Sequence, residues 1–174
     1  MRELYYDFQG QIEVLIRGDR FRTALRQFDT EYQHFRTDAA MDPDLVINLG
    51  PFEAATDETT VLDDKFEIAD DYLYTSDSYK YAQWEFEDSG FEDGPLTINI
   101  DTNLVGRSFV PGIVADPFLF YLLNENGYPV IHASCVRRGS RGYAFAGPSG
   151  SGKTTHAVEM TERNFEVLAD DSVI

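Results

Sequence analysis

Short apolar runs, many of them alternating with polar residues, fill the first hundred positions of the chain and are typical of strands. Such runs predict strands within residues 4–8, 11–16, 45–49 and 96–100, and an antiparallel meander over residues 65–87. Gln9-Gly10 is expected to join the first two runs as a hairpin, and the meander is expected to turn at Asp70-Asp71 and Ser76-Asp77. We therefore predict a β-rich region with a sheet that is wet on one face.

A helical period occurs in one stretch of this region. Phe21, Leu25 and Phe28 follow the i, i+4, i+7 spacing of one helix face, which predicts a short helix within residues 19–32. Residues 53–64 and 87–94 are acidic and contain few large apolar side chains, so we expect solvated loops there.

The pattern changes after residues 111–112, where strand-like and helix-like stretches begin to alternate. Asp116 is expected to cap a helix that has Pro117 at its first position and ends at Gly127. A strand over residues 130–136, a basic turn, a strand over residues 143–146, a further helix and a strand over residues 165–171 are expected to follow. The predicted fold class is therefore α/β, with a β-rich region over residues 1–114 and a second region over residues 115–174.

The second region contains a full match to the phosphate-loop pattern GxxxxGK[ST]. Its candidate nucleotide-binding residues are Gly147, Ser149, Gly150, Ser151, Gly152, Lys153, Thr154 and Thr155. The glycines let backbone N–H groups approach phosphate oxygens, and the helix that follows adds the positive end of its dipole. Lys153 is positioned to reach phosphates, and the Thr154 hydroxyl to bind Mg²⁺. A glycine–serine linker would lack the apolar strand before the motif and the helical period after it, so we predict binding of ATP with Mg²⁺.

Two carboxylates, Asp170 and Asp171, end the last apolar run, where open α/β sheets place their ligands. One is expected to hold Mg²⁺ and the other to accept a proton from an attacking hydroxyl; a solvated Asp-Asp turn is the alternative. His132 lies in the middle of a predicted strand, where a structural role and an active-site role both remain open.

Three arginines, Arg137, Arg138 and Arg141, form a basic turn whose role is either an exposed hairpin or a contact with an anionic ligand. His156 is expected to face solvent, and Cys135 to be a small buried side chain.

Composition adds limits on partners. The 43% apolar content, with 13 Phe and 10 Tyr, is enough for a folded core. A net charge of −17 repels nucleic acid and anionic lipid, so neither is expected as a partner. This charge favours a surface adapted to high salt, with an acidic face for a basic protein partner as the alternative. The single cysteine excludes an internal disulfide and fits a reducing, cytoplasmic location, and no apolar run is long enough to cross a bilayer.

The order of these motifs resembles a known family. Ile131-His132-Ala133-Ser134, the phosphate loop and Leu168-Ala169-Asp170-Asp171 resemble the catalytic core of HPr kinase/phosphorylase and the related ATP-dependent phosphoenolpyruvate carboxykinases. The resemblance covers residues 115–174, whereas residues 1–114 are unlike either family. It implies an HPr-kinase-like nucleotide-binding core with Lys153 on phosphate and Thr154 on Mg²⁺. It also implies that Asp170 and Asp171 act as metal ligand and general base, with Asp171 a candidate ligand, and that His132 belongs to the active site.

From the motif and the resemblance together we expect phosphoryl transfer from ATP to a hydroxyl, on a protein serine or a small molecule. A nucleotide-binding module without catalysis, or a truncated gene product, is the alternative. Because the chain ends soon after Asp171, we expect the core to be incomplete at its C-terminal end. We also expect the last strand to lack a neighbour and the protein to self-associate as a homo-oligomer.

Overall fold

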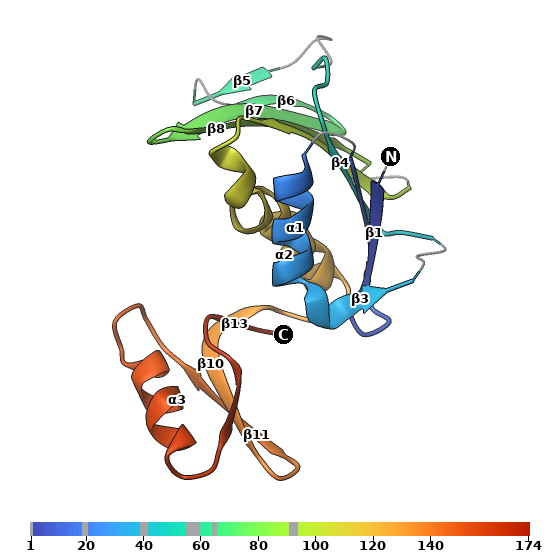
Figure 1. The fold of residues 1–174 in the computed structure, drawn as a ribbon. Coiled ribbons are helices and arrows are strands. Elements are labelled where there is room, and N and C mark those ends of the chain that lie inside the picture. Colours follow the sequence, from blue (N-terminus) through green and yellow to red (C-terminus); the bar gives the residue numbers. More distant parts are fainter. Residues whose placement is uncertain (1, 19–20, 39–41, 55–59, 64–65, 91–93) are drawn as a thin grey trace. The chain divides into compact units, whose positions relative to one another are not determined.

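The computed structural model describes residues 2–18, 21–38, 42–54, 60–63, 66–90 and 94–174. The chain is a strand-rich α/β protein that divides into two compact units, Met1–Leu122 and Leu123–Ile174 (Figure 1). The boundary falls within helix α2 (Asp116–Glu125), whereas the sequence pattern placed it between residues 114 and 115. The first half of α2 contributes side chains to the first unit: the ring of Phe118 packs edge-on against Phe86 at 5.5 Å between centroids.

The first unit contains one mixed sheet of nine strands in the order β3-β1-β2-β4-β9-β8-β7-β6-β5. Their bounds are β1 (Arg2–Asp7), β2 (Glu13–Gly18), β3 (Arg36–Thr37), β4 (Leu45–Leu49), β5 (Thr60–Leu62), β6 (Phe66–Ala69), β7 (Tyr72–Tyr79), β8 (Ala82–Ser89) and β9 (Leu96–Thr102). The β1–β2 hairpin and the antiparallel β6–β7–β8 meander confirm the sequence predictions. Strand β4 lies parallel to both β2 and β9, and this pairing joins the hairpin and the meander into one sheet.

Helices cover one face of this sheet, which curves around α1 in Figure 1. The bounds are α1 (Arg22–Glu31), the 3₁₀ helices η1 (Gln33–Phe35) and η2 (Gly106–Ser108), and the π-helical segment η3 (Pro111–Ala115). The core lies under α1, where Phe28 is completely buried and packs on Tyr32. Alternate sheet positions such as Ile16, Ile47 and Ile98 are also completely buried, as the period of two requires.

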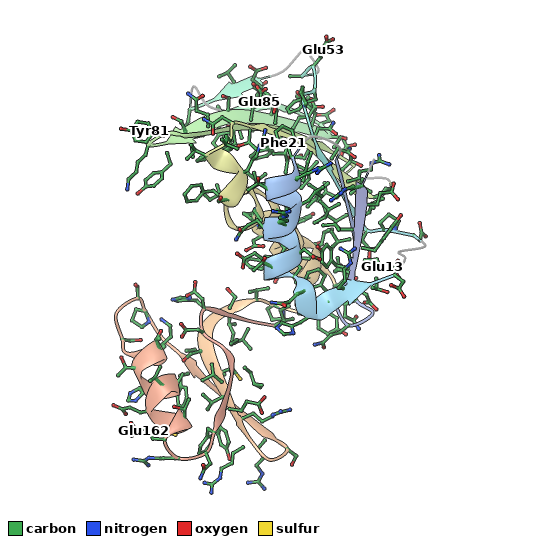
Figure 2. The ribbon with its side chains drawn as sticks, in the orientation of Figure 1. Glu13, Phe21, Glu53, Tyr81, Glu85 and Glu162 are labelled. Carbon is green, nitrogen blue, oxygen red and sulfur yellow. The ribbon has the colours of Figure 1, made fainter. Side chains whose placement is uncertain are left out.

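Two local predictions in this unit are wrong. Strand β7 does not turn at Ser76-Asp77 but continues to Tyr79, and the β7–β8 turn is made by Lys80 and Tyr81. Lys80 takes a φ of +56°, and Tyr81 projects away from the sheet at 84% exposure (Figure 2). The predicted acidic loops over residues 53–64 and 87–94 lie partly outside the described residues, and their described parts include β5 and the end of β8.

Asp116 does not cap a helix, because the helical backbone already runs through η3 before it. Its carboxylate instead accepts a hydrogen bond from the Tyr32 hydroxyl. Burial raises the pKa of Asp116, and burial followed by the Asp116 charge raises the pKa of Tyr32 well above its usual range. The pair therefore ties the start of α2 to the end of α1 rather than ending a helix.

The opposite face of the sheet carries a row of polar side chains that the sequence did not predict. Arg17 Nε donates to Asn48 Oδ1 at 2.6 Å, and Asn48 Nδ2 donates to Asn99 Oδ1 at 2.7 Å. Asn99 Nδ2 then donates to Glu87 Oε1 at 2.8 Å, and the Tyr72 hydroxyl donates to Glu87 Oε2 at 3.1 Å. These bonds connect five adjacent strands, β2, β4, β9, β8 and β7, across the middle of the polar face of the sheet.

The second unit is a smaller sheet with one helix. Its elements are β10 (Ile131–Arg138), β11 (Arg141–Ala146), α3 (Lys153–Thr161), β12 (Glu166–Ala169) and β13 (Ser172–Val173). Strand β10 is central and pairs antiparallel with β11 on one side and with β12 and β13 on the other. Strands β11 and β12 therefore run parallel to each other, and α3 connects them as in a βαβ unit.

None of the helices in the described part of the chain is long and apolar enough to span a membrane.

Candidate functional site

The glycine-rich loop, residues 147–152, connects the end of β11 to the start of α3. Gly150 and Gly152 have φ values of +77° and +88°, a conformation that strains any residue with a Cβ atom. A Cβ on Gly147 would lie 2.8 Å from Ser151 Oγ, so a larger residue at this position would have to displace the Ser151 hydroxyl. Gly150 and Gly152 thus have the positive φ that glycines in such a loop allow, whereas Gly147 does not.

Lys153 is the first residue of α3 and is buried, with 8% of its surface exposed. Its Nζ donates hydrogen bonds to the carbonyl oxygens of Gly147 at 3.0 Å and Pro148 at 3.1 Å. These bonds fold the ammonium group back over the loop, where it satisfies the requirement that a buried charge be hydrogen-bonded. The loop therefore holds a positive charge against its own backbone.

His132 and the two aspartates come from the other strands of the second unit. His132 lies on β10, and Asp170 and Asp171 form the bend between β12 and β13, with His132 paired to Ser172 in register. The Nδ1 atom of His132 lies 2.9 Å from the main-chain oxygen of Asp171 and 3.1 Å from its carboxylate Oδ1. Because a carbonyl oxygen can only accept, Nδ1 carries the hydrogen, and Nε2 of the neutral ring carries the lone pair.

These residues and the loop enclose one cavity of about 320 Å³. It is lined by His132, Ser149, Gly150, Gly152, Lys153, Thr154, Thr155, Asp170 and Asp171. The structure therefore brings together the predicted site residues, with two exceptions. Gly147 and Ser151 shape the loop and do not line the cavity.

The cavity could hold a metal ion only with few protein ligands, completed by phosphate oxygens and water. Among the described residues no cluster of three or more His, Cys, Asp or Glu side chains is arranged to hold a metal ion. Mg²⁺ characteristically uses one or two carboxylates, a hydroxyl and phosphate oxygens, and keeps several waters. The Thr154 hydroxyl and the Asp171 carboxylate line the same cavity and fit that donor set.

The basic turn lies at the far end of β10 from His132 and does not line the cavity. Arg137 forms an ion pair with Glu166, with 2.5 Å between Nη2 and Oε2, and Arg138 lies over the ring of Phe165. Both contacts brace the hairpin against β12 and the residue before it, which matches the exposed-hairpin alternative.

The other two candidates also lie outside the cavity. His156 is exposed on α3, with its Nδ1 atom 3.8 Å from a Glu159 carboxylate oxygen. Cys135 is buried at the centre of β10, as expected for a small apolar side chain.

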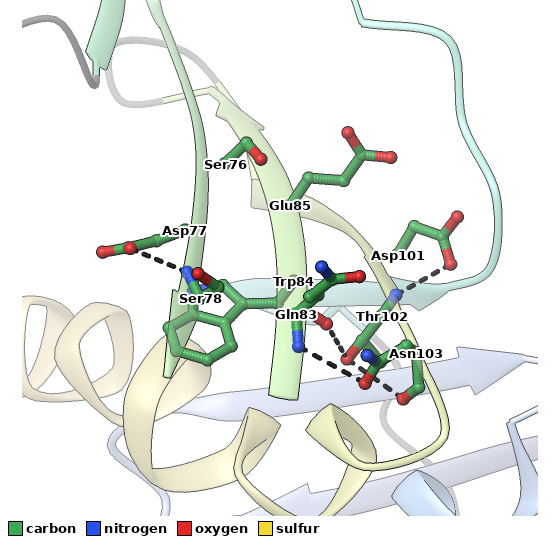
Figure 3. A pocket seen from close by; sticks show the side chains of 9 residues that line it. All are labelled: Ser76, Asp77, Ser78, Gln83, Trp84, Glu85, Asp101, Thr102 and Asn103. Carbon is green, nitrogen blue, oxygen red and sulfur yellow. Dashed lines mark hydrogen bonds between the residues drawn. The ribbon is translucent and has the colours of Figure 1, made fainter. Parts of the chain in front are cut away.

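A larger cavity of about 620 Å³ lies in the first unit, at the ends of β7, β8 and β9 (Figure 3). Its lining includes the carboxylates of Asp77, Glu85 and Asp101, and contains no lysine, arginine or histidine. Such a lining repels a phosphate group. The smaller cavity of the second unit, and not this larger one, therefore has the chemistry that an anionic nucleotide requires.

Ser134, two positions after His132 on β10, is a buried polar residue that sequence reasoning did not single out, and it does not line the cavity. It is completely buried, and its Oγ has no hydrogen-bond partner. Its register partner is Phe145, whose ring lies 6.0 Å from the His156 ring on α3, so Ser134 faces α3. Ser134 follows His132 by two positions on one strand, and this period of two is the signal that could have placed both on one face.

Comparison of the chain with family models, with curated proteins and with solved structures found no match.

Proposed function

We propose that this protein binds ATP with Mg²⁺ and transfers its terminal phosphoryl group to a hydroxyl, in the manner of the HPr-kinase-like proteins that its motifs resemble. One observation carries the proposal. Lys153, Thr154, His132 and the Asp170-Asp171 pair, which come from three separate segments, line a single cavity in the second unit.

The glycine-rich loop would bind the phosphates through its backbone N–H groups and the N-terminal end of α3. Lys153 already lies over this loop, and exchanging its two carbonyl contacts for phosphate oxygens replaces neutral acceptors with charged ones. Charge-assisted hydrogen bonds of this kind are roughly twice as strong as neutral ones. Nucleotide binding would therefore be strengthened by Lys153.

The two aspartates divide their roles according to their contacts. Asp171 binds His132 through its main-chain oxygen and Oδ1, which leaves Oδ2 and the nearby Thr154 hydroxyl for Mg²⁺. When bound, Mg²⁺ neutralises the charge that develops on the phosphate oxygens. Asp170 is exposed and its carboxylate has no partner within the described residues, so it is free to accept the proton of an acceptor hydroxyl.

The test of binding is isothermal calorimetry with Mg-ATP on the wild type, Lys153→Ala and Arg163→Ala. Arg163 is an exposed cation of the same unit that does not line the cavity, so it controls for the loss of one positive charge. We expect Lys153→Ala to weaken binding by about 10²-fold or more and Arg163→Ala to leave it nearly unchanged. Equal affinities for the wild type and Lys153→Ala would contradict the proposal.

Transfer is tested with labelled ATP and a panel of hydroxyl acceptors that includes serine peptides and polyols. Asp170→Asn is expected to retain nucleotide affinity and lose transfer, because the amide cannot accept the proton. A protein that binds nucleotide and labels none of these acceptors would support the non-catalytic module instead.

A further inference from the structure

We propose that His132 is a nucleophile that carries the phosphoryl group covalently on Nε2 before the group reaches a hydroxyl. The proposal rests on the proposed function, because a nucleoside triphosphate must supply the phosphoryl group. It adds a covalent site on the protein, and neither the phosphate-loop motif nor the Asp170-Asp171 pair requires one.

The first support is the tautomer of the His132 ring. The 2.9 Å contact from Nδ1 to the main-chain oxygen of Asp171 requires a hydrogen on Nδ1, since that oxygen cannot donate. In the neutral form of the ring the lone pair is therefore on Nε2, which has no hydrogen-bond partner within the described residues. An unprotonated Nε2 is the nucleophilic form of the imidazole.

The second support is where the ring lies. His132 is half exposed and lines the same cavity of about 320 Å³ as Lys153, Thr154 and the glycine-rich loop. A phosphate chain held by the loop would therefore occupy the same cavity that the ring lines. A ring acting only as a base would need an acceptor hydroxyl to enter between Nε2 and the phosphate, whereas a nucleophile needs the phosphate alone.

The third support is the carboxylate of Asp171, whose Oδ1 lies 3.1 Å from Nδ1. Bond formation at Nε2 leaves the ring with a positive charge while the hydrogen stays on Nδ1. A carboxylate beside Nδ1 stabilises that charge and holds the ring in orientation, as an aspartate does for an imidazolium that forms during acyl transfer. The arrangement of a nucleophile oriented by a neighbouring group is the one that covalent catalysis uses.

The first step balances without a proton transfer. The Nε2 lone pair forms a bond to the terminal phosphorus, the bond from that phosphorus to the bridging oxygen breaks, and its electron pair leaves with the nucleoside diphosphate. In the second step the oxygen of an acceptor hydroxyl bonds to phosphorus and the N–P bond breaks, returning its electron pair to Nε2. The hydroxyl proton goes to Asp170.

The test uses the full chain with Mg-ATP labelled in its terminal phosphate and no acceptor. The variants are His132→Asn, which keeps a donor toward Asp171 and removes the nucleophile, and His156→Asn, which removes an exposed histidine outside the cavity. Asp170→Asn, with its transfer step blocked, and Lys153→Ala complete the set. Calorimetry with Mg-ATP on the same preparations reports binding independently of labelling.

We expect wild type, His156→Asn and Asp170→Asn to take up label that is stable to alkali, lost in acid and returned to ATP when unlabelled ADP is added. Phosphorus NMR should identify it as phosphohistidine substituted on Nε2. His132→Asn should bind ATP and lose the label, and Lys153→Ala should lose both.

Label that persists in His132→Asn, or label that is stable to acid as a serine phosphate is, would overturn the proposal. A wild type that binds Mg-ATP and takes up no label would also overturn it, and leave the proposed function standing as direct transfer or as simple binding. A wild type that binds no Mg-ATP would overturn both.

Discussion

The two units of this protein bury different kinds of side chain. In the first unit the buried positions are large and apolar, with Tyr6, Phe28, Ile16 and Ile98 completely buried. In the second unit, apart from Leu123 at the end of α2, the buried side chains are small or polar: Ala133, Ser134, Cys135, Val136, Lys153 and Ala157. Apolar burial stabilises a fold by about 25 cal/mol per Å², so the first unit has by far the larger share of hydrophobic stabilisation.

Both units expose some large apolar side chains, and in the small second unit these lie on its helix and on an edge strand. Val158 on α3 is 59% exposed, and Val167 and Leu168 on β12 are 41% and 51% exposed. Strand β12 pairs only with β10 within the described residues, as expected for a strand without a second neighbour. This edge is the surface on which the self-association predicted from the sequence would depend.

Charge divides the units in the same way. Residues 123–174 carry five basic and six acidic side chains, so nearly all of the −17 net charge belongs to the first unit. An acidic phosphate-binding unit would repel its ligand, whereas a nearly neutral one holding Lys153 would not. Under the proposed function, the first unit is the stabilising scaffold and the small second unit carries the chemistry.

Removing a large buried side chain from the first unit should cause the largest decrease in the free energy of unfolding. Phe28→Ala leaves a cavity under α1 and should lower the free energy of unfolding by about 3–5 kcal/mol. The same change at Phe165, a partly exposed ring in the second unit, should cost only about 1 kcal/mol. Urea titration followed by circular dichroism measures both, and equal costs would contradict the proposed division of stability.

A buried carboxylate gives the first unit a pH dependence. Asp88 is 1% exposed and its two carboxylate oxygens have no hydrogen-bond partner. Burial, followed by the charges of Asp71 and Glu87, raises the pKa of Asp88 from 3.8 to about 7. The native state therefore binds a proton more tightly than the unfolded chain, so this contribution to stability is complete below about pH 4 and is lost as the pH rises through 7.

Asp88→Asn should consequently raise the free energy of unfolding by about 2–4 kcal/mol at pH 8 and change it little at pH 4. Asp70→Asn, in the exposed β6–β7 turn, is the control and should show neither effect. Thermal melts across this pH range measure the difference. A destabilised Asp88→Asn protein at pH 8 would show that the charged carboxylate is stabilising.

In the second unit Ser134→Ala should be neutral to stabilising, by up to about 1 kcal/mol, because it removes a buried hydroxyl that has no partner. Ser140→Ala, in the exposed turn between β10 and β11, should change nothing. Thermal melts with and without Mg-ATP separate two roles for Ser134. A loss of ATP affinity in Ser134→Ala alone would show that the hydroxyl serves the ligand rather than the fold.

Added salt should raise the stability of the first unit and lower the affinity of the second unit for Mg-ATP. Screening relieves the self-repulsion of the acidic first unit, so stability should rise by about 0.5–1 kcal/mol, roughly 2–4 °C in Tm, between low and molar KCl. Affinity of the second unit for Mg-ATP should fall over the same range, because its contacts to phosphate are charged. A flat or falling Tm would contradict the interpretation of the acidic surface as an adaptation to salt.

Local features of the fold followed from the sequence. The hairpin, α1 and α3 formed where periodicity and turn residues predicted them, because each depends on contacts between residues close in the chain. Strands β4 and β9 also formed where their apolar runs predicted them, although their sheet partners are distant in the chain. The errors at Ser76-Asp77 and Asp116 have one cause. Turn and cap residues only favour a local conformation, and tertiary contacts can outweigh that preference. Pairing with the whole of β8 keeps β7 extended through Ser76-Asp77, and a helix that has already begun at η3 continues through Asp116.

The sequence by itself also determined the conformation of residues 147–152, since glycines at fixed spacing are needed for positive φ at Gly150 and Gly152. Only the tertiary structure decided which side chains share a cavity with this loop. The pairing of β13 with β10 sets Asp171 beside His132, selects the tautomer of that ring and encloses the cavity with Lys153. Burial of Asp88 and the joining of hairpin and meander through β4 are likewise decided by strands distant in the chain. Periodicity reports which face of a strand is buried, but the partner across a sheet is chosen by the packing of the whole unit.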